Sequence, residues 1–274
     1  MRPYCWHYVG ILQLPSDPLN ETRVIKQTKK QRPGDESDRD GIHNTIFHKP
    51  EIQSMKKNAF LYRNSLGLML FAIFVVLLTG QAYFGWQEHN NEMVEKGGLT
   101  VNLREYLGTA HFVEATFENF ESEFFQMGIY VLFTIFLRQI GSSESKKLEG
   151  KEEVDRVPQP HENAPWPVKK GGLWLTLYSY SLSLAFLLLF FVSFVIHAVS
   201  SNREYNNDQI LKGEPGETLL EYLGNSRLWF ESMQNWQSEF IAVFSIVVLS
   251  IFLRQKGSPE SKPVDAPYSE TGSS

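Results

Sequence analysis

Apolar residues are gathered into four blocks along the chain instead of being spread evenly. Two of these blocks, residues 66–86 and residues 174–199, contain no formally charged side chain. Each block reaches the roughly 20 apolar residues that a helix needs to cross the ~30 Å hydrocarbon layer of a membrane. The two blocks therefore predict a first and a third transmembrane helix.

The other two blocks are shorter. Residues 124–137 and residues 240–253 each contain 14 uncharged residues, which cover only about 21 Å as a helix. A buried helix of a soluble domain would be an alternative. However, each block ends in the sequence IFLRQ, whose Arg138 or Arg254 can reach a membrane interface as an anchor. Aromatic residues before each block suit the opposite interface. The predicted spans are therefore about 66–86, 119–138, 174–199 and 235–254.

The two halves of the predicted membrane domain repeat each other. Residues 64–146 match residues 180–262 without a gap, and about 30 of the 83 aligned positions are identical. EHNN recurs as EYNN, NFESEF as NWQSEF, and GSSESK as GSPESK. Because each repeat contains two spans, both enter the membrane from the same side. The sequence predicts an all-α integral membrane protein made from two tandem, parallel two-helix repeats.

Basic residues indicate the orientation of these helices. They cluster before the first span, between the second and third spans, and after the fourth span. The two remaining connections contain few basic residues, and the first is rich in glutamate: Glu88, Glu92, Glu95, Glu105, Glu114, Glu118 and Glu121. The positive-inside rule then predicts cytoplasmic termini, a cytoplasmic centre and two acidic outer loops that are partly helical.

Three segments lie outside the predicted spans. Residues 1–54 are polar and lack a helical period, so they predict a disordered extension or a start site that truly lies at Met55. Residues 147–172 are charged and proline-rich, which is typical of a linker between repeat 1 (55–146) and repeat 2 (173–262). The tail, residues 263–274, is also expected to be disordered.

Composition narrows the possible functions. The net charge is −5, which argues against a nucleic-acid partner, and the single cysteine, Cys5, excludes an intramolecular disulfide. Neither a metal-ligand spacing nor a nucleophile with a nearby base is found in the sequence. We therefore expect no enzymatic activity, no metal and no cofactor.

Several of these strings resemble a known family. MKKNAFLYRNSLGLMLF, the NFESEF and NWQSEF pair, NAPWPVKKGG and LRQKGSPESKPV are similar to an uncharacterised bacterial membrane-protein family that is catalogued only as a domain of unknown function. The resemblance covers about residues 55–274. It implies a multi-pass protein of the bacterial plasma membrane, and it brings no activity, substrate or catalytic residue.

One set of polar residues is a candidate site. In the second span these residues share one helix face, and the others lie at equivalent or similar depths. Glu123 lies 15 residues before Arg138, about 22 Å along the helix, and therefore inside the predicted hydrocarbon layer. The candidate layer comprises Asn119, Ser122, Glu123, Gln126, Asn235, Ser238, Glu239, Gln81 and His197.

Two functions are compatible with this layer. Membrane-embedded carboxylates suggest a proton or cation translocator that uses Glu123 and Glu239. Polar side chains also hold membrane helices together, and the polar face does not continue inward in the second repeat, where Ile246 follows Ala242. The sequence therefore favours a structural or accessory protein that works through helix packing and its acidic loops. Its expected partners are the lipid bilayer, a second copy or another membrane protein.

The predicted orientation can be tested by cysteine labelling. In a chain whose Cys5 is replaced by serine, Glu95→Cys and Glu214→Cys should react with a membrane-impermeant thiol reagent in intact cells. Glu153→Cys should react only after the cells are opened, because it lies in the cytoplasmic linker. Labelling of Glu153→Cys alone in intact cells would mean that the orientation is reversed.

Overall fold

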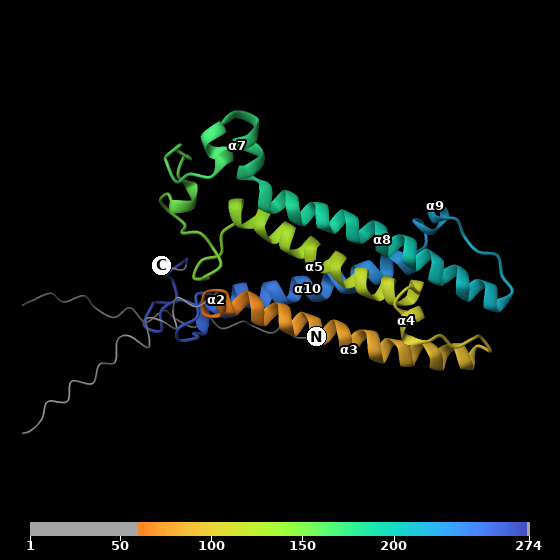
Figure 1. Cartoon of the computed structure of the whole chain (residues 1–274). Helices are drawn as coiled ribbons and strands as arrows, with labels where there is room; N and C mark the ends of the chain where they lie inside the picture. Colours follow the sequence, from red (N-terminus) through yellow and green to blue (C-terminus); the bar gives the residue numbers. More distant parts are fainter. Residues whose placement is uncertain (1–59, 273–274) are drawn as a thin grey trace, which may run out of the picture. The chain divides into compact units, whose positions relative to one another are not determined.

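The computed structural model describes residues 60–272 (Figure 1), and the predicted extension of residues 1–54 lies outside them. Within this range the chain is helical and contains no strand, as expected. The helices are α2 (Phe60–Arg63), α3 (Ser65–Glu95), α4 (Leu103–Tyr106), α5 (Ala110–Phe136), the 3-10 helix η1 (Glu153–Asp155), α6 (Trp166–Lys170), α7 (Gly172–Ser179), α8 (Ser181–Lys212), α9 (Leu219–Tyr222) and α10 (Ser226–Phe252).

Three of these helices are long and apolar enough to cross a membrane: α3, α8 and α10. Helix α5 is as long as α10, with 27 residues, but it does not reach the same hydropathy because glutamates occupy its first half. Large apolar side chains are exposed along α3, α8 and α10, whereas the buried residues are mostly polar. This distribution is the reverse of a water-soluble domain and is compatible with a lipid environment.

Helix boundaries in the two halves of the chain recur at a constant offset. Helices α8, α9 and α10 each begin 116 residues after α3, α4 and α5 respectively. The last residues of α9 and α10 keep that offset from α4 and α5, and α8 is one residue longer than α3. The same helical elements therefore follow each other in the same order in both halves.

The third predicted span, residues 174–199, is not one helix. It is divided at Tyr180, whose backbone angles (φ −114°, ψ 9°) separate α7 from α8. The Ser179 and Ser181 hydroxyls donate to the carbonyls of Leu175 and Tyr178 at 2.8 Å, and such side-chain bonds bend helices. Asn64, the equivalent residue, separates α2 from α3 with φ −117° and ψ 16°. The correction therefore concerns the third predicted span, which begins in the separate helix α7, whereas the first predicted span, residues 66–86, lies entirely within α3.

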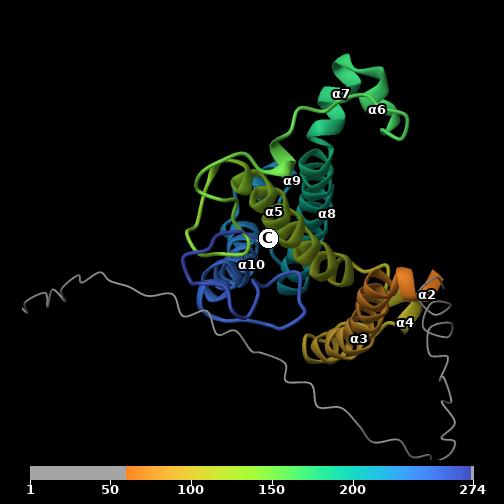
Figure 2. The same cartoon turned by 90° about the vertical axis from the view of Figure 1, so that its left-hand side faces the viewer.

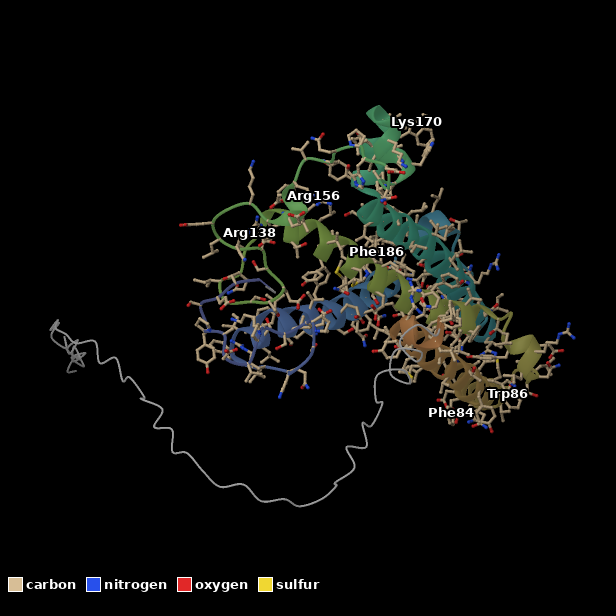
Figure 3. The ribbon with its side chains drawn as sticks, turned by 60° about the vertical axis from the view of Figure 1, so that its left-hand side comes forward. Phe84, Trp86, Arg138, Arg156, Lys170 and Phe186 are labelled. Atoms are coloured by element: carbon tan, nitrogen blue, oxygen red, sulfur yellow. The ribbon has the colours of Figure 1, made fainter. Side chains whose placement is uncertain are left out.

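Helix α5 lies between α8 and α10 and packs most extensively on α8 (Figure 2). Gly128 permits their close approach, because a Cβ atom at this position would lie 3.4 Å from the Cβ atom of Phe186 (labelled in Figure 3). Helix α3 contacts α4 and α5, and its apolar segment contains no buried residue. The core of this part of the chain is therefore built around α5.

A repeated asparagine fixes the loop at the α4 and α9 end of each half. The Asn90 side chain accepts from the Val101 N–H at 2.8 Å and donates to its carbonyl at 2.9 Å. Asn206 makes the same pair of bonds with Glu217, at 2.7 and 2.9 Å. Helices α4 and α9 then each begin with a reciprocal capping box. The first asparagine of EHNN and of EYNN therefore has the same structural role in both halves.

The opposite ends of α5 and α10 are closed by matching turns. The Gln139 N–H donates to Ser145 Oγ and the Gln255 N–H donates to Ser261 Oγ, both at 2.9 Å. In each turn a glycine of the GSSESK or GSPESK sequence has a positive φ, 83° at Gly141 and 85° at Gly257. These sequences therefore terminate helices.

The C-terminal tail is held in place through residue 272, which differs from the disorder that its composition predicts. The buried Lys262 ammonium group donates to the carbonyl oxygens of Pro267, Tyr268 and Glu270 at 2.8–3.2 Å. Thr271 accepts from the Gly141 N–H at 2.9 Å, which joins the tail to the turn after α5. The tail is ordered because one lysine and one threonine satisfy backbone groups that its sequence leaves unpaired.

We expect Lys262→Met to release this tail. The variant loses three charge-assisted hydrogen bonds to carbonyl groups, so we expect a loss of about 2 kcal/mol in unfolding free energy and faster proteolysis after residue 262. Lys146→Met is the matched control, because the equivalent Lys146 pairs instead with the exposed Asp155 and should matter much less. Equal melting temperatures and equal proteolysis for both variants would contradict this role of Lys262.

Candidate functional site

A buried polar network joins α5, α8 and α10 near the end of the helices that carries α4 and α9. At its centre are Glu121 on α5 and His197 on α8, both with 0% of the side chain exposed. Glu121 Oε2 lies 2.6 Å from His197 Nδ1, and Glu121 Oε1 accepts from the Trp236 indole N–H of α10 at 2.9 Å. One carboxylate therefore links three helices.

Glu231 on α10 is a second carboxylate of the network. Its Oε2 accepts from the Ser201 hydroxyl at 2.8 Å and lies 3.5 Å from His197 Nε2, so the imidazole stands between two carboxylates. Its Oε1 accepts from Arg227 Nε at 2.8 Å. Tyr222 of α9 reaches Ser201 with an O–O distance of 2.6 Å, and burial raises the pKa of Tyr222 to about 12. At neutral pH this tyrosine is therefore an uncharged hydroxyl.

Arg227 extends the network toward α3 and the first turns of α5. It lies 3.3 Å from the buried Glu114 of α5 and 3.5 Å from Asp208 of α8. Asp208 also pairs with Lys96 at 2.9 Å, and this hydrogen bond raises the pKa of Lys96. Glu118 accepts from the Asn235 side-chain amide. The network thus reaches from its buried centre to the solvent-facing end of α3.

Helical spacing brings these groups together. Glu114, Glu118 and Glu121 follow each other at i, i+4 and i+7, which places three carboxylates on one face of α5. His197 and Ser201 on α8, and Arg227 and Glu231 on α10, each follow an i, i+4 pattern.

An aromatic layer borders the network on its other side. Phe125 is one turn after Glu121, and its ring packs against Phe190 of α8 at 5.0 Å and against Trp236 and Phe240 of α10 at 4.5 and 5.8 Å. The same three helices therefore contribute both the polar network and the apolar layer that follows it.

The structure divides the sequence-predicted layer. His197 and Asn235 belong to the network, and Gln81 donates to Thr116 at 3.3 Å within the first half of the chain. Glu123 of α5 is exposed and Glu239 of α10 is half-buried, so neither carboxylate is enclosed as Glu121 is. The remaining members do not join them: Asn119, Ser122 and Ser238 donate to carbonyls of their own helices, and Gln126 is buried with an unpaired amide nitrogen.

Sequence reasoning missed most of the network. The sequence pattern counts Glu114, Glu118 and Glu121 in an acidic outer loop, although the predicted span 119–138 already includes Glu121; in the structure α5 begins at Ala110 and includes all three. The signal that could have found them is their shared helical face. The other missed members are Glu231, Ser201, Arg227, Tyr222 and Trp236.

A second, smaller cluster surrounds His89 of α3. Its ring is 5.1 Å from that of His111, and the Tyr106 hydroxyl is 3.0 Å from His111 Nδ1. Among the described residues, no group of three or more His, Cys, Asp or Glu side chains is arranged to hold a metal ion. The rings of His89, His111 and Tyr106 pack against one another, with centroids 5.1–5.8 Å apart.

Comparison with known proteins gives one match. The family described as Domain of unknown function (DUF6766) matches residues 57–273, which is most of the chain. Searches of curated proteins and of solved structures each found no match.

We expect the Glu121–His197 pair to be coupled in stability. His197→Gln should cost about 3–5 kcal/mol, because it leaves a buried carboxylate without its ion-pair partner. The double variant Glu121→Gln/His197→Gln should recover most of that loss, since two amides can pair with each other. At the positions that align with Glu121 and His197 in the other repeat, the chain already carries two glutamines, Gln237 and Gln81.

Thermal unfolding in detergent measures this coupling. Glu123→Gln is the matched control, because it changes an exposed carboxylate on the same helix; its expected cost is about 1 kcal/mol or less. The pair is not coupled if the loss of unfolding free energy in the double variant equals the sum of the losses in Glu121→Gln and His197→Gln.

Proposed function

The chain belongs to the DUF6766 family, and we propose that it is a multi-pass plasma-membrane protein with a structural or accessory role and no enzymatic activity. The observation that carries this proposal is the Glu121–His197–Glu231 network. Each of these side chains is engaged by a neighbouring helix, which is the arrangement expected of groups that hold a bundle together.

The proposed architecture has four spans in two parallel repeats, with α5 as the span of lowest hydropathy. Helix α5 can still cross a membrane because α8 and α10 cover its polar face. Glu114 and Glu121 point into this interface and are buried, so lipid would not meet these two carboxylates, whereas Glu123 is exposed. In a single helix the same glutamates would oppose insertion.

Both termini and the linker are proposed to be cytoplasmic, in a bacterial plasma membrane, with α4 and α9 on the outer side. The acidic side chains at that end, among them Glu88 and Glu92 on the last turns of α3, would then be presented outside. They would suit a membrane-protein partner or a second copy, in addition to the surrounding lipid.

A proton or cation translocator is the second candidate. One observation favours it: the network contains five carboxylates, of Glu114, Glu118, Glu121, Asp208 and Glu231, but only three basic side chains, Lys96, His197 and Arg227. The aromatic layer of Phe125, Phe190, Trp236 and Phe240 argues against it. These rings occupy the position through which an ion would have to pass between α5, α8 and α10. We therefore favour the structural role.

Flux measurements separate the two candidates. In vesicles that contain the purified protein and a pH-sensitive dye, we expect no proton or cation flux above that of protein-free vesicles. Glu121→Gln and Glu123→Gln should leave this baseline unchanged, as should the control Glu105→Gln in helix α4. A wild-type flux that depends on pH and disappears in Glu121→Gln or Glu123→Gln would establish the translocator instead.

A further inference from the structure

A groove lies between α5 and α10 at the end where both helices terminate in IFLRQ. Its volume is about 350 Å³, within the range of roughly 300–1,000 Å³ typical of small-ligand sites. One wall comes from α5, including Phe133 and Leu137, and the facing wall comes from Val243, Phe244 and Val247 of α10. The walls of the groove are therefore mostly apolar, and the groove opens to the outside of the helix bundle.

Arg138 lies at the mouth of this groove, at the end of α5 (labelled in Figure 3). Its NH1 group donates to the carbonyls of Ile135 and Leu137, at 3.1 and 2.9 Å. Within residues 60–272 its Nε and NH2 groups make no hydrogen bond and its guanidinium forms no salt bridge. Two guanidinium nitrogens are thus left to bind an external anion.

The equivalent arginine in the second half of the chain differs. Arg254 uses Nε and NH2 to donate to the carbonyls of Pro263 and Ala266, at 3.2 and 3.1 Å. The C-terminal tail therefore already occupies the position that remains open beside Arg138. The cavity at Arg254 is also incomplete, because its lining residues come only from α10 and the turn that follows it.

Nearby acidic groups do not occupy Arg138. Glu144 lines the groove, but its oxygens accept from the Tyr130 hydroxyl at 2.9 Å and the Ser143 hydroxyl at 3.4 Å. Asp155 is paired with Lys146. The Arg138 guanidinium therefore stays available at the mouth of the groove, because the nearby carboxylates of Glu144 and Asp155 are bound to other groups.

We propose that this groove binds one anionic phospholipid, with an acyl chain between α5 and α10 and the phosphate on Arg138. The inference rests on the proposed membrane location and adds a specific lipid site to it. An apolar groove that ends in an arginine matches the two parts of a phospholipid, because a guanidinium binds phosphate with two parallel hydrogen bonds. Basic sites between membrane helices recognise lipid headgroups in this way.

Lipid binding to the purified full-length protein tests the proposal. The probes are phosphatidylglycerol and phosphatidylcholine with identical acyl chains, and native mass spectrometry measures the lipid retained by each chain. Both lipids offer a phosphate to Arg138, but phosphatidylcholine also brings a positively charged choline next to the guanidinium. We therefore expect the wild-type protein to bind phosphatidylglycerol about tenfold more tightly than phosphatidylcholine, because the net negative charge is kept only in phosphatidylglycerol. Inorganic phosphate should not compete, because it lacks the acyl chain.

Three variants locate the site. Arg138→Gln should remove the preference for phosphatidylglycerol, and Val243→Trp should weaken the binding of both lipids by filling the groove. Arg254→Gln is the matched control and should retain the preference, because the tail occupies that arginine. Equal retention of phosphatidylglycerol by wild type, Arg138→Gln and Val243→Trp would overturn the proposal, as would competition by inorganic phosphate. If either of these results is found while the protein still fractionates with membranes, the lipid-site proposal is wrong but the proposed membrane location is not.

Discussion

Glu121 on α5 and His197 on α8 are both fully removed from solvent, and neither can be separated from the other without leaving a polar group unpaired in an apolar environment. Trp236 of α10 binds the second oxygen of the same carboxylate, so the relative positions of three helices depend on one side chain. The remaining ion pairs extend outward from this contact through Glu231 and Arg227. A shift of any of the three helices along its axis would break several of these bonds at once.

This constraint also explains the unusual composition of α5. Glutamates in its first half lower its hydropathy below that of α3, α8 and α10, yet they are the groups that bind α8 and α10. Most of its glutamates therefore lie where neighbouring helices cover them, and Glu123 is the exposed exception. The position of α5 in a membrane would therefore be stabilised by its contacts with α8 and α10. The hydropathy of its own sequence does not show that these contacts exist.

Much of the fold follows from patterns within single segments. The uncharged blocks mark the core of α3 and α8, and IFLRQ marks the ends of α5 and α10, since α5 ends at Phe136 and α10 at Phe252. The network was harder to predict because it depends on contacts between segments. The depth of His197 in the third block predicts its place in the polar layer, but the same argument from depth points to Glu123 instead of its actual partner Glu121, two residues away. On a helix, two residues separate a buried face from an exposed one, and the choice between them requires knowledge of the neighbouring helix.

The two halves of the chain share most of their helix boundaries but differ at central positions of the ionic network. Glu121 and His197 correspond to Gln237 and Gln81, and Arg227 corresponds to His111. The helix-ending turns and the loop-anchoring asparagines are instead the same in both halves. Shared residues therefore build the common backbone, whereas differing residues from both halves join to form the ionic network. Arg138 and Arg254 are the same residue type, but the C-terminal tail occupies only Arg254, which leaves Arg138 available at the groove. Any specific activity of this protein should thus be sought where its halves differ, because the features they share are accounted for by the geometry of the helices and turns.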